Sequence, residues 1–369
     1  MKVFVSAGET SGDRLGASLI RELARRRPDL AFFGMGGSRM EKEGLARVAD
    51  SAAVTVVGLF EVIGKLPAVW RTARRLERAA ARERPAAAIL IDFPDFHLRL
   101  GRRLARLGIP VVYYVSPQVW AWRAGRVPAM RSFVRRMITL FPFETDIYRG
   151  AGIDAVCAGH PLVDEVDARL AGDPPAPRAA GKKRITIMPG SRAGEVRRHG
   201  PVLRDAALRL AATRPAEIVV VPAPGLPASI FPGAAEGTMT FHHGDPEPVL
   251  AASDVVLVSS GTSTLQAALC GAPMVVVYRT SAATMALARK LVKTPHIALA
   301  NIVAGERVVP ELVQEEATVD RVFREAARFL DSPEETEAVR RRWSTLRERL
   351  GPRGAAARAA EAVLEVLPA

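Results

Sequence analysis

Short apolar runs alternate with longer amphipathic stretches along most of this sequence. In the first half the apolar runs occupy residues 2–5, 31–33, 86–91, 110–115 and 137–140. In the second half they occupy residues 184–188, 217–221, 255–259 and 273–278. Alternation of this kind is typical of βα units around a parallel sheet. The two series predict an α/β protein with two Rossmann-like parallel-sheet domains that face each other across a cleft.

The length of the chain also indicates two domains. At 369 residues it exceeds the size at which a single core usually keeps growing. The Pro- and Gly-rich stretch 171–177 interrupts the alternation, so we assign a first domain to 1–170, a linker to 171–183 and a second domain to 184–349. Residues 350–369 form a last helix expected to pack back on the first domain. Further helices are predicted at 193–213, 262–270, 320–330 and 334–350, and a loop at 222–237.

Composition narrows the class of protein and its location. No N-terminal stretch has the pattern of a secretory signal, and no uncharged apolar segment reaches the roughly 18 to 20 residues that span a bilayer. We therefore expect a cytoplasmic protein. The two cysteines, Cys157 and Cys270, lack metal-ligand spacing and are expected to be reduced, buried thiols. The net charge of +13 favours an anionic partner, either nucleic acid or lipid, unless the arginines only form solvated helix faces.

The first predicted strand runs directly into a turn that carries two acids. Residues 6–13 read SAGETSGD, and a helical pattern follows at once. Glycines and a helix N-terminus would suit a phosphate, but Glu9 and Asp13 would repel it and no phosphate-loop motif is present. The alternative is that Ser11 or Asp13 caps the helix while Gly12 shapes the turn.

Two turns in the second half fit an anion better. The first contains Gly190, Ser191 and Arg192, with Glu195 one turn later; the second contains Ser260, Gly261, Thr262 and Ser263. Each places small residues at a helix N-terminus, where backbone N–H groups and the helix dipole attract phosphate. Arg192 adds a guanidinium that can pair with an anion through two hydrogen bonds. Together the turns favour a diphosphate site, and helix capping is the alternative for each.

A pair of acids follows the predicted strand 86–91. Asp92 comes directly after it, where a side chain faces the ligand-binding edge of a parallel sheet, so Asp92 is the leading candidate for a general base. Asp95 precedes a helical run and is expected to be its N-cap. After the next strand, Trp120 and Trp122 could stack on a sugar or a base, or pack against the sheet.

An unusually apolar segment, residues 54–70, is followed by a basic helix. An apolar patch beside arginines suits docking on anionic lipid without spanning it, although an ordinary core helix would give the same pattern. The candidate membrane-docking residues are Val57, Leu59, Phe60, Val62, Ile63, Leu66 and Trp70.

Taken in order, these segments resemble the lipid-A-disaccharide synthases, glycosyltransferases of the GT-B type. The resemblance covers nearly the whole chain and includes several long and chemically unusual motifs. They are AGETSGD at 7–13, DFPDF at 92–96, YVSPQVWAW at 114–122, FPFE at 141–144, GHPLVD at 159–164, PGSR at 189–192, SGT at 260–262 and NIVAG at 301–305.

The resemblance implies a reaction and its surroundings. The 2,3-diacylglucosamine of UDP-2,3-diacylglucosamine would pass to 2,3-diacylglucosamine 1-phosphate, giving a β(1→6) disaccharide 1-phosphate and UDP. Such enzymes are inverting, need neither a catalytic metal nor a cofactor, and are peripheral on the cytoplasmic face of the membrane. Nucleic acid would then not be a partner, and a homodimer is an open alternative.

The resemblance also assigns roles to residues. Asp92, Arg192 and Asn301 would be catalytically important, and Glu9, Ser11, Gly12, Asp13 and Asp95 would line the acceptor side. UDP would lie on the turns of the second domain, with Glu311 and Gln314 nearby. Two features depart from the family: Gln266 stands where a Glu usually contacts ribose, and the loop 222–237 is shorter and richer in proline.

Rival interpretations come from two classes. Another UDP-sugar enzyme of the same fold, such as the peptidoglycan N-acetylglucosaminyltransferase or a UDP-N-acetylglucosamine 2-epimerase, would share the sheets but is disfavoured by the motifs at 7–13 and 114–122. A basic nucleic-acid-binding protein without catalysis would explain the charge. It is disfavoured because the sequence has neither an aromatic RNA-reading motif nor zinc spacing.

Overall fold

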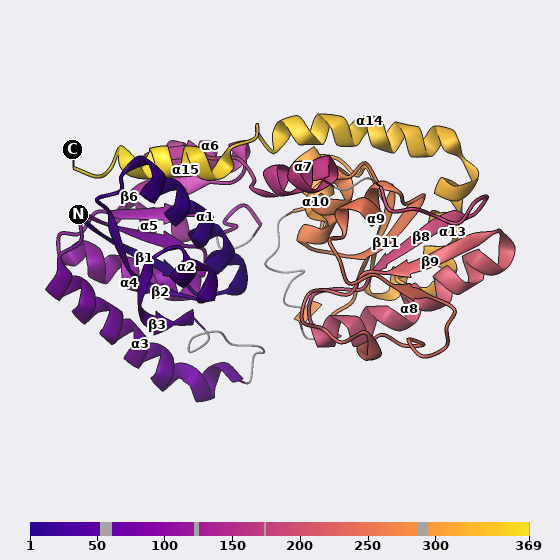
Figure 1. Ribbon diagram of the computed structural model, residues 1–369, viewed down its shortest axis with the longest axis horizontal. Coiled ribbons are helices and arrows are strands. Elements are labelled where there is room, and N and C mark those ends of the chain that lie inside the picture. Colours follow the sequence, from indigo (N-terminus) through magenta and orange to yellow (C-terminus); the bar gives the residue numbers. More distant parts are fainter. Residues whose placement is uncertain (52–60, 122–124, 173–174, 283, 286–293, 369) are drawn as a thin grey trace. The chain divides into compact units, whose positions relative to one another are not determined.

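The computed structural model describes residues 1–369 except 52–60, 122–124, 173–174, 283, 286–293 and 369, and for residues 61–66 it describes the backbone alone. The chain forms two compact units. The first comprises Met1–Pro161 and Gly351–Ala369, and the second comprises Leu162–Leu350. Each unit is built around its own sheet with helices on both faces (Figure 1).

The first unit contains a parallel sheet of seven described strands in the order β3-β2-β1-β4-β5-β6-β7. Its strands are β1 (Lys2–Ala7), β2 (Ala31–Gly36), β3 (Leu45–Asp50), β4 (Ala87–Ile91), β5 (Val111–Tyr114), β6 (Val134–Thr139) and β7 (Ala155–Cys157). Its helices are α1 (Thr10–Arg26), α2 (Ser38–Lys42), α3 (Glu61–Glu83), α4 (Pro94–Arg106), α5 (Arg126–Arg131), α6 (Pro142–Gly150) and α15 (Ala355–Leu364).

The second unit repeats this plan with six described strands in the order β10-β9-β8-β11-β12-β13. Its strands are β8 (Lys183–Met188), β9 (Ala216–Val220), β10 (Thr240–Phe241), β11 (Val255–Ser259), β12 (Met274–Tyr278) and β13 (Glu311–Val313). Its helices are α7 (Leu162–Gly172), α8 (Ala193–Thr213), α9 (Glu247–Ala251), α10 (Thr262–Leu269), α12 (Leu299–Ala304), α13 (Val319–Asp331) and α14 (Pro333–Arg349). Two parallel sheets in α/β units confirm the predicted class, an α/β protein with two parallel-sheet domains.

Alternation along β1 shows how the sheet builds both its core and its edge. Val3 and Val5 point to one face, while Phe4 and Ser6 point to the other. Phe4 joins a buried cluster that contains Leu90 on β4, Tyr113 on β5 and side chains from α3, α4 and α5. Ser6, two residues further along the same face, therefore lies over α4.

The two units begin and end at residues that differ from the predicted domain boundaries. The first boundary lies at Pro161, so α7 belongs to the second unit. The described residues of the stretch 171–183, expected to be a linker, lie within that unit: the backbone N–H of Ala176 donates to Pro248 O (3.0 Å), and Ala176 O accepts from Arg184 Nη1 (2.9 Å). At the other end, α15 packs against α1 within the first unit.

Candidate functional site

Both sheets have the strand order of a doubly wound fold, which places two turns side by side where the order reverses. In the first unit these turns follow β1 and β4, which are hydrogen-bonded neighbours. In the second unit they follow β8 and β11, also neighbours. Ligands of such sheets bind beyond the strand ends at this reversal. Each pair of predicted motif turns thus lies at the switch point of its own sheet.

The turn after β4 holds two residues in an unusual backbone conformation. Asp92 has φ 51° and Phe93 has φ 50°, the left-handed region that side-chain-bearing residues seldom adopt. Each such residue costs about 1–3 kcal/mol and persists only where its surroundings impose it. We call Asp92 and Phe93 the Asp92 turn.

Three hydrogen bonds fix the Asp92 backbone. Its N–H donates to Tyr114 O (2.9 Å). Its carbonyl oxygen accepts from the Tyr113 hydroxyl (2.8 Å) and from Nδ1 of His97 (2.7 Å). Tyr113 and His97 are fully buried, so these bonds are shielded from competing water.

His97 in turn is held by Ser6 on β1. Its Nε2 lies 2.8 Å from Ser6 Oγ. Because the Asp92 carbonyl can only accept, Nδ1 carries the proton, and Nε2 must accept from the Ser6 hydroxyl. Burial lowers the pKa of His97 to about 4, which keeps this ring neutral, as the arrangement requires. Neither Ser6 nor His97 was singled out from the sequence.

The Asp92 carboxyl has a raised pKa. Burial is the larger cause and the negative charge of Glu9 is the second; together they raise the pKa of Asp92 to about 6. The carboxylate is still ionised at neutral pH and is a stronger base than an exposed Asp. A pKa near the working pH is what a general base needs.

Gly8 explains why the turn after β1 carries glycine. A Cβ at Gly8 would lie 2.2 Å from Cδ1 of Phe93. The Phe93 ring therefore lies directly against the backbone after β1, and its edge contacts His97. Close packing of the two turns thus depends on a missing side chain.

The side chains of Glu9, Ser11 and Asp13 differ in exposure to solvent. Glu9 occupies the N-cap position of α1 without a side-chain capping bond, and Glu9 and Ser11 are exposed. Gly12 is buried beside Ala7. The alternative that Ser11 or Asp13 caps this helix is therefore wrong.

Asp13 instead caps a different helix. It is 5% exposed, and its carboxylate accepts from the backbone N–H groups of Gly37 (2.7 Å), Arg39 (3.2 Å) and Met40 (3.2 Å) at the start of α2. Its oxygens are committed to that turn, which argues against a contact with sugar hydroxyls and leaves Glu9 as the exposed acid beside Asp92.

Asp95 also differs from its predicted role. The N-cap of α4 is Phe93, while Asp95 lies in the first turn and pairs with Arg126. Its side chain is largely exposed. The left-handed Phe93 takes the N-cap position because the strained turn leads directly into the helix.

In the second unit, the turn Pro189–Arg192 is hydrogen-bonded to the carboxylate of Glu195 in the first turn of α8. Gly190 has φ 122°, which favours glycine. Glu195 Oε2 accepts from the backbone N–H of Ser191 (3.0 Å) and Arg192 (3.3 Å). Its other oxygen pairs with Arg192 Nη1 (3.0 Å). The capping alternative is thus observed, and an anion at these donors would compete with Glu195.

The Arg192 side chain nevertheless stays available. It is 70% exposed, so a phosphate can approach it without unfolding the helix start. Nearby, the Ser259 hydroxyl is 2% exposed and has no hydrogen-bond partner among the described residues. It would lie 3.5 Å from a Cβ on Gly190, which shows how closely the turns after β8 and β11 approach.

In the turn after β11, two hydroxyls form hydrogen bonds within the second unit. Ser260 Oγ donates to Ile297 O (2.8 Å), and Ser263 Oγ donates to Ser259 O (3.1 Å). Gly261 is the N-cap of α10 with φ 151°, and it makes no side-chain capping bond. Thr262 is the exposed hydroxyl of this turn. Side-chain capping does not account for the turn, since the hydroxyls of Ser260 and Ser263 donate to backbone carbonyl groups.

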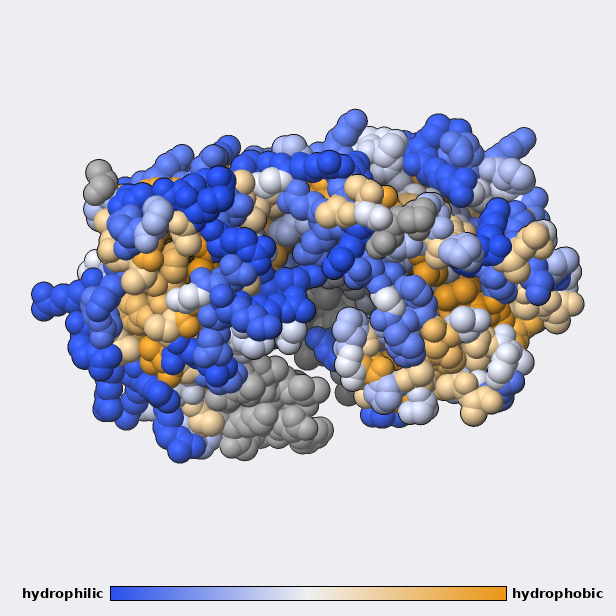
Figure 2. Space-filling view, viewed as in Figure 1, coloured by the Kyte–Doolittle hydropathy of each residue, from blue (hydrophilic) through white to orange (hydrophobic). Residues whose placement is uncertain are grey.

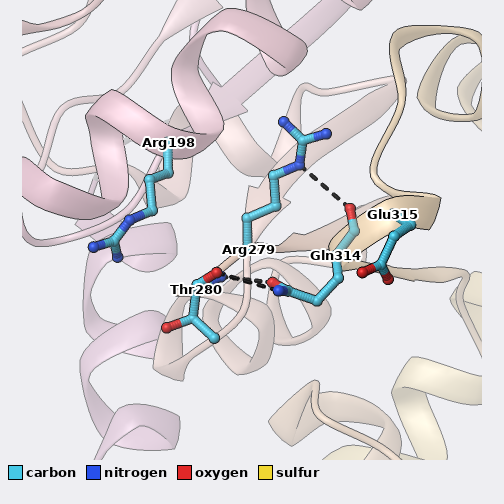
Figure 3. A pocket seen from close by; sticks show the side chains of 5 residues that line it. All are labelled: Arg198, Arg279, Thr280, Gln314 and Glu315. Carbon is cyan, nitrogen blue, oxygen red and sulfur yellow. Dashed lines mark hydrogen bonds between the residues drawn. The ribbon is translucent and has the colours of Figure 1, made fainter. Parts of the chain in front are cut away.

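A pocket of about 400 Å³ opens beside the next two strands. It is lined by Arg198, Arg279, Thr280, Gln314 and Glu315 (Figure 3). Gln314, one of the predicted nucleotide-binding residues, is held by Thr280, whose N–H donates to Gln314 Oε1 (2.7 Å). The guanidinium of Arg279 donates to Gln314 O (3.3 Å). Two arginines at one pocket make it suited to an anion.

Sequence reasoning missed Arg198 and Arg279. Arg279 directly follows β12, so the same strand-end argument that selected Asp92 could have found it. Its backbone N–H donates to Nε2 of the buried His199 (2.9 Å), which ties the end of β12 to α8. Arg198 lies next to that histidine on α8 and carried no distinguishing signal.

Asn301 supports the site rather than lining it. The side chain is fully buried, and its amide donates to Val309 O (2.9 Å) and Glu311 Oε1 (2.8 Å). Its oxygen accepts from Val308 N (3.0 Å) and Val309 N (3.2 Å). Because these groups use all of its bonding capacity, the geometry gives Asn301 a positioning role, and its catalytic role stays a prediction.

Glu311 is committed in the same way. It is 7% exposed and accepts from the backbone N–H of Ile297 (3.0 Å) and Ala298 (3.1 Å) as well as from Asn301. This carboxylate therefore orders the segment that leads into α12, and its place near the nucleotide stays a prediction.

Trp120, in the aromatic segment after β5, packs within the first unit. Trp120 Nε1 donates to the buried Glu144 (2.9 Å), and its ring meets Phe143 edge to face. Burial and several neighbouring donors act in opposite directions on Glu144, with burial dominant, so its pKa rises to about 7. For Trp120 the packing alternative is the one observed; Trp122 lies outside the described residues.

Most of the candidate membrane-docking residues lie outside the part of the chain whose side chains the structure describes. Val57, Leu59 and Phe60 lie outside the described residues, as do the side chains of Val62, Ile63 and Leu66.

Trp70 on α3 is described and is 50% exposed. Arg74 stacks over its ring at 4.0 Å and Arg103 at 5.5 Å. Hydrophilic residues predominate along α3 on the face shown in Figure 2. Within the described part of the chain, no helix is both long and apolar enough to cross a bilayer.

Comparison with known proteins gives a consistent result. Residues 3–363 match the family described as lipid-A-disaccharide synthetase. The chain is 43% identical to the lipid-A-disaccharide synthase of Myxococcus xanthus strain DK1622, over 100% of this chain and 98% of that protein. It is 44% identical to the enzyme of the same name from Anaeromyxobacter dehalogenans strain 2CP-C, over 99% and 97%.

Solved structures share the fold. The glycotransferase of kitacinnamycin matches with a TM-score of 0.65 and 19% identity, over 100% of this chain and 98% of that one. The UDP-GlcNAc 2-epimerase from Neisseria meningitidis bound to UDP-GlcNAc matches with a TM-score of 0.65 and 14% identity, over 99% and 100%. Identities this low show a common two-sheet architecture and nothing of the substrate.

Proposed function

Because the chain belongs to the lipid-A-disaccharide synthase family and is a glycosyltransferase of lipid A biosynthesis, we propose the substrates on which it acts. The donor is UDP-2,3-diacylglucosamine and the acceptor is 2,3-diacylglucosamine 1-phosphate. The products are the β(1→6)-linked disaccharide 1-phosphate and UDP.

The observation that carries this proposal is the Asp92 turn. It presents a carboxylate with a pKa raised to about 6 at the switch point of the first sheet, on a backbone held by Tyr113, Tyr114 and His97. Glycosyl transfer to a hydroxyl requires a base that takes the hydroxyl proton as the new bond forms. Asp92 has the basicity for this step and is held rigidly.

The proposed reaction is a single inverting displacement. Asp92 accepts the proton of the acceptor 6-hydroxyl while that oxygen attacks the anomeric carbon of the donor sugar. The bond from the anomeric carbon to the UDP oxygen breaks, and its electron pair leaves with UDP. Negative charge grows on the diphosphate, where Arg192, 70% exposed, can pair with it.

A direct assay separates this function from its rivals. UDP release would be measured with each acylated sugar alone and with both together, and the disaccharide would be identified by mass spectrometry. We expect UDP release only when both are present. UDP release from the donor without acceptor, or conversion of UDP-N-acetylglucosamine to its 2-epimer, would contradict the proposal.

We also propose that the enzyme works at an anionic membrane surface through the segment that includes Trp70. The exposed indole, flanked by the guanidinium groups of Arg74 and Arg103, combines an apolar anchor with positive charge. Basic residues near an anionic bilayer contribute about 1 kcal/mol each. Replacing Leu59, Phe60 and Trp70 with polar residues should therefore reduce binding to membranes.

Sedimentation with vesicles checks this expectation. Wild-type protein should sediment with vesicles that contain anionic lipid and much less with neutral ones, while the triple variant should stay in the supernatant. Leu107→Gln changes another exposed apolar side chain of the first unit and should bind like wild type. Equal sedimentation of all three proteins would count against docking at this segment.

A further inference from the structure

A second strained backbone position lies beside the Asp92 turn. Val115 directly follows β5 and has φ 67°, in the same left-handed region as Asp92 and Phe93 after β4. Strands β4 and β5 are hydrogen-bonded neighbours, so the strained positions lie at adjacent strand ends. A positive φ is a genuine outlier for a β-branched residue such as valine. Such a conformation persists only where the surrounding structure imposes it.

The Val115 conformation affects the Asp92 turn through one peptide group. The peptide between Tyr114 and Val115 supplies the carbonyl that accepts from the Asp92 N–H (2.9 Å) and the N–H that donates to Ile138 O (3.0 Å). The φ angle of Val115 is one of the two soft dihedral angles that flank this planar peptide, so it helps to set the direction of the Tyr114 carbonyl. Whatever holds Val115 in place therefore also holds the backbone of Asp92.

Helix α6 supplies two side chains that hold the residues after Val115. The Tyr148 hydroxyl donates to Pro117 O (3.1 Å), and Glu144 Oε1 accepts from Trp120 Nε1 (2.9 Å). Glu144 and Tyr148 are four residues apart, so they lie on the same face of α6, and both are buried. The segment 115–121 is thus fixed at two points along its length.

Glu144 suits this place because it accepts hydrogen bonds on both oxygens. While Oε1 accepts from Trp120, Oε2 accepts from the backbone N–H groups of Leu140 (3.3 Å) and Phe141 (3.3 Å) at the start of α6. An amide has one oxygen and one NH₂ group, so a glutamine could satisfy the donors on one side only. Burying a carboxyl group is costly, and the link from α6 to Trp120 is what the acid provides that a glutamine would not.

We propose that Glu144 is a positioning residue for glycosyl transfer. By anchoring Trp120 it keeps the segment 115–121 in the conformation that directs Tyr114 O toward the Asp92 N–H, and so it holds the base in its strained turn. This inference rests on the proposed role of Asp92 as the general base. A residue that only capped α6 would support the fold and would have no separate effect on the catalytic step.

Glu144→Gln tests the link with little change in shape. Its amide oxygen can still accept from Leu140 and Phe141, but its NH₂ group then faces the Trp120 N–H, and two donors cannot bond to each other. We expect kcat to fall by about tenfold because the base is held less precisely. KM for each acylated sugar and Kd for UDP should stay within about twofold of wild type, since the change removes no group proposed to bind substrate.

Combination with D92N separates positioning of the base from general support. A residue that acts through Asp92 has nothing left to position once the base is gone. The double variant D92N/E144Q should therefore turn over within about twofold of D92N. If Glu144 only stabilised the first unit, the loss caused by E144Q would multiply the loss caused by D92N.

Two further variants control this comparison. Thr145→Val removes a buried hydroxyl from the next position of α6, where it is hydrogen-bonded to Thr139 on β6 (2.6 Å), and it should keep the kcat of wild type. Trp120→Phe breaks the proposed link from the other side and should lower kcat as E144Q does, which keeps the test open if E144Q does not fold. Thermal unfolding of each variant would show that the first unit is intact.

The possible outcomes separate the two proposals. If UDP release does not require both sugars, or folded D92N has near-normal turnover, the proposed function or its base is wrong, whatever E144Q does. If D92N is impaired as expected, three results would each overturn the positioning role of Glu144. They are a wild-type kcat in folded E144Q or W120F, an equal loss from E144Q with and without D92N, and a loss of kcat in T145V as large as that in E144Q.

Discussion

The Asp92 turn in the first unit and the turn Pro189–Arg192 in the second lie at equivalent edges of two similar sheets, yet they are built in opposite ways. Asp92 is half-buried in a left-handed backbone that three hydrogen bonds hold. Arg192 is 70% exposed and pairs with Glu195, three residues away. A base gains from burial because its pKa rises, whereas a group that receives a charged leaving group gains from being reachable.

This difference predicts distinct effects of substitution. Changes around Asp92 should lower kcat and leave UDP binding nearly intact, whereas changes around Arg192 should weaken UDP binding. A variant that moved both quantities together would break the division of labour between the units.

The largest effect is expected for Asp92→Asn. Loss of a general base lowers kcat by about 10²- to 10⁴-fold, and the dissociation constant for UDP should stay within about twofold of wild type. Steady-state kinetics and UDP titration check both parts. Near-normal turnover by folded D92N would show that Asp92 is not the base.

The same variant should be more stable than wild type at neutral pH. Burial first and Glu9 second raise the pKa of Asp92 from 3.8 to about 6, so the folded state binds this proton more tightly than the unfolded chain does. The ionised carboxylate thus costs stability, fully above pH 6, by the order of 1–3 kcal/mol. D92N removes the cost, and its advantage in urea unfolding should shrink as pH falls from 6 to 4.

A smaller effect, on a different quantity, is expected for Arg192→Ala. Removing a charged hydrogen-bond partner of the diphosphate should weaken UDP binding by about 1.5–3 kcal/mol, or roughly 10- to 100-fold. Arg197→Ala removes an exposed arginine from the same helix, so it controls for net charge. If R197A weakened UDP as much as R192A, the contribution would be general electrostatic attraction.

The next effect is expected for His97, which donates a hydrogen bond to the Asp92 carbonyl. His97→Ala removes a fully buried ring and one hydrogen bond to the Asp92 carbonyl, so it should cost about 2–4 kcal/mol of stability and lower kcat by about tenfold. His97→Asn can still donate to that carbonyl and should recover part of kcat. Equal kcat for folded H97A and wild type would mean that Tyr113 and Tyr114 hold the turn by themselves.

The smallest effect concerns Glu9. Its charge is the second cause of the raised pKa of Asp92, so Glu9→Gln should lower that pKa and move the acid limb of kcat/KM to lower pH by under about one unit. Wild-type kcat/KM should fall about tenfold per unit below pH 6 because protonated Asp92 cannot act as a base. Glu41→Gln should leave the profile in place. An unshifted limb in E9Q would separate Glu9 from the base.

The sequence predicts the repeated parts of this fold well. Helix α8 has the bounds predicted from its periodicity, and the long strands other than β3 lie where apolar runs occur. Strand β3, with the sequence LARVAD, has no continuous apolar run and was not predicted. The short strands β7, β10 and β13 were not predicted, because two or three residues carry no periodicity. Helix α2 was missed for the same reason, although Asp13 caps it from another part of the chain.

The site was predictable only where function follows from position along a strand. Asp92 was found because it ends a buried strand, and its support was not, because Ser6 and His97 are separated by 91 residues and meet only in the folded sheet. Asn301 and Glu311 were predicted as site residues, but their burial and their hydrogen bonds to neighbouring backbone groups appear only in the folded structure.

The return of the chain to the first unit has a consequence for biosynthesis. The N-terminal unit is closed by α15, whose Ala359, Ala360 and Val363 are buried, while Arg358 donates to Ala158 O (2.9 Å). A ribosome makes residues 162–350 before this helix exists, so the second unit can finish folding while the first still exposes the face of α1 that α15 will cover. The half that is translated first is thus completed last, and its apolar surface has to be protected from aggregation throughout elongation.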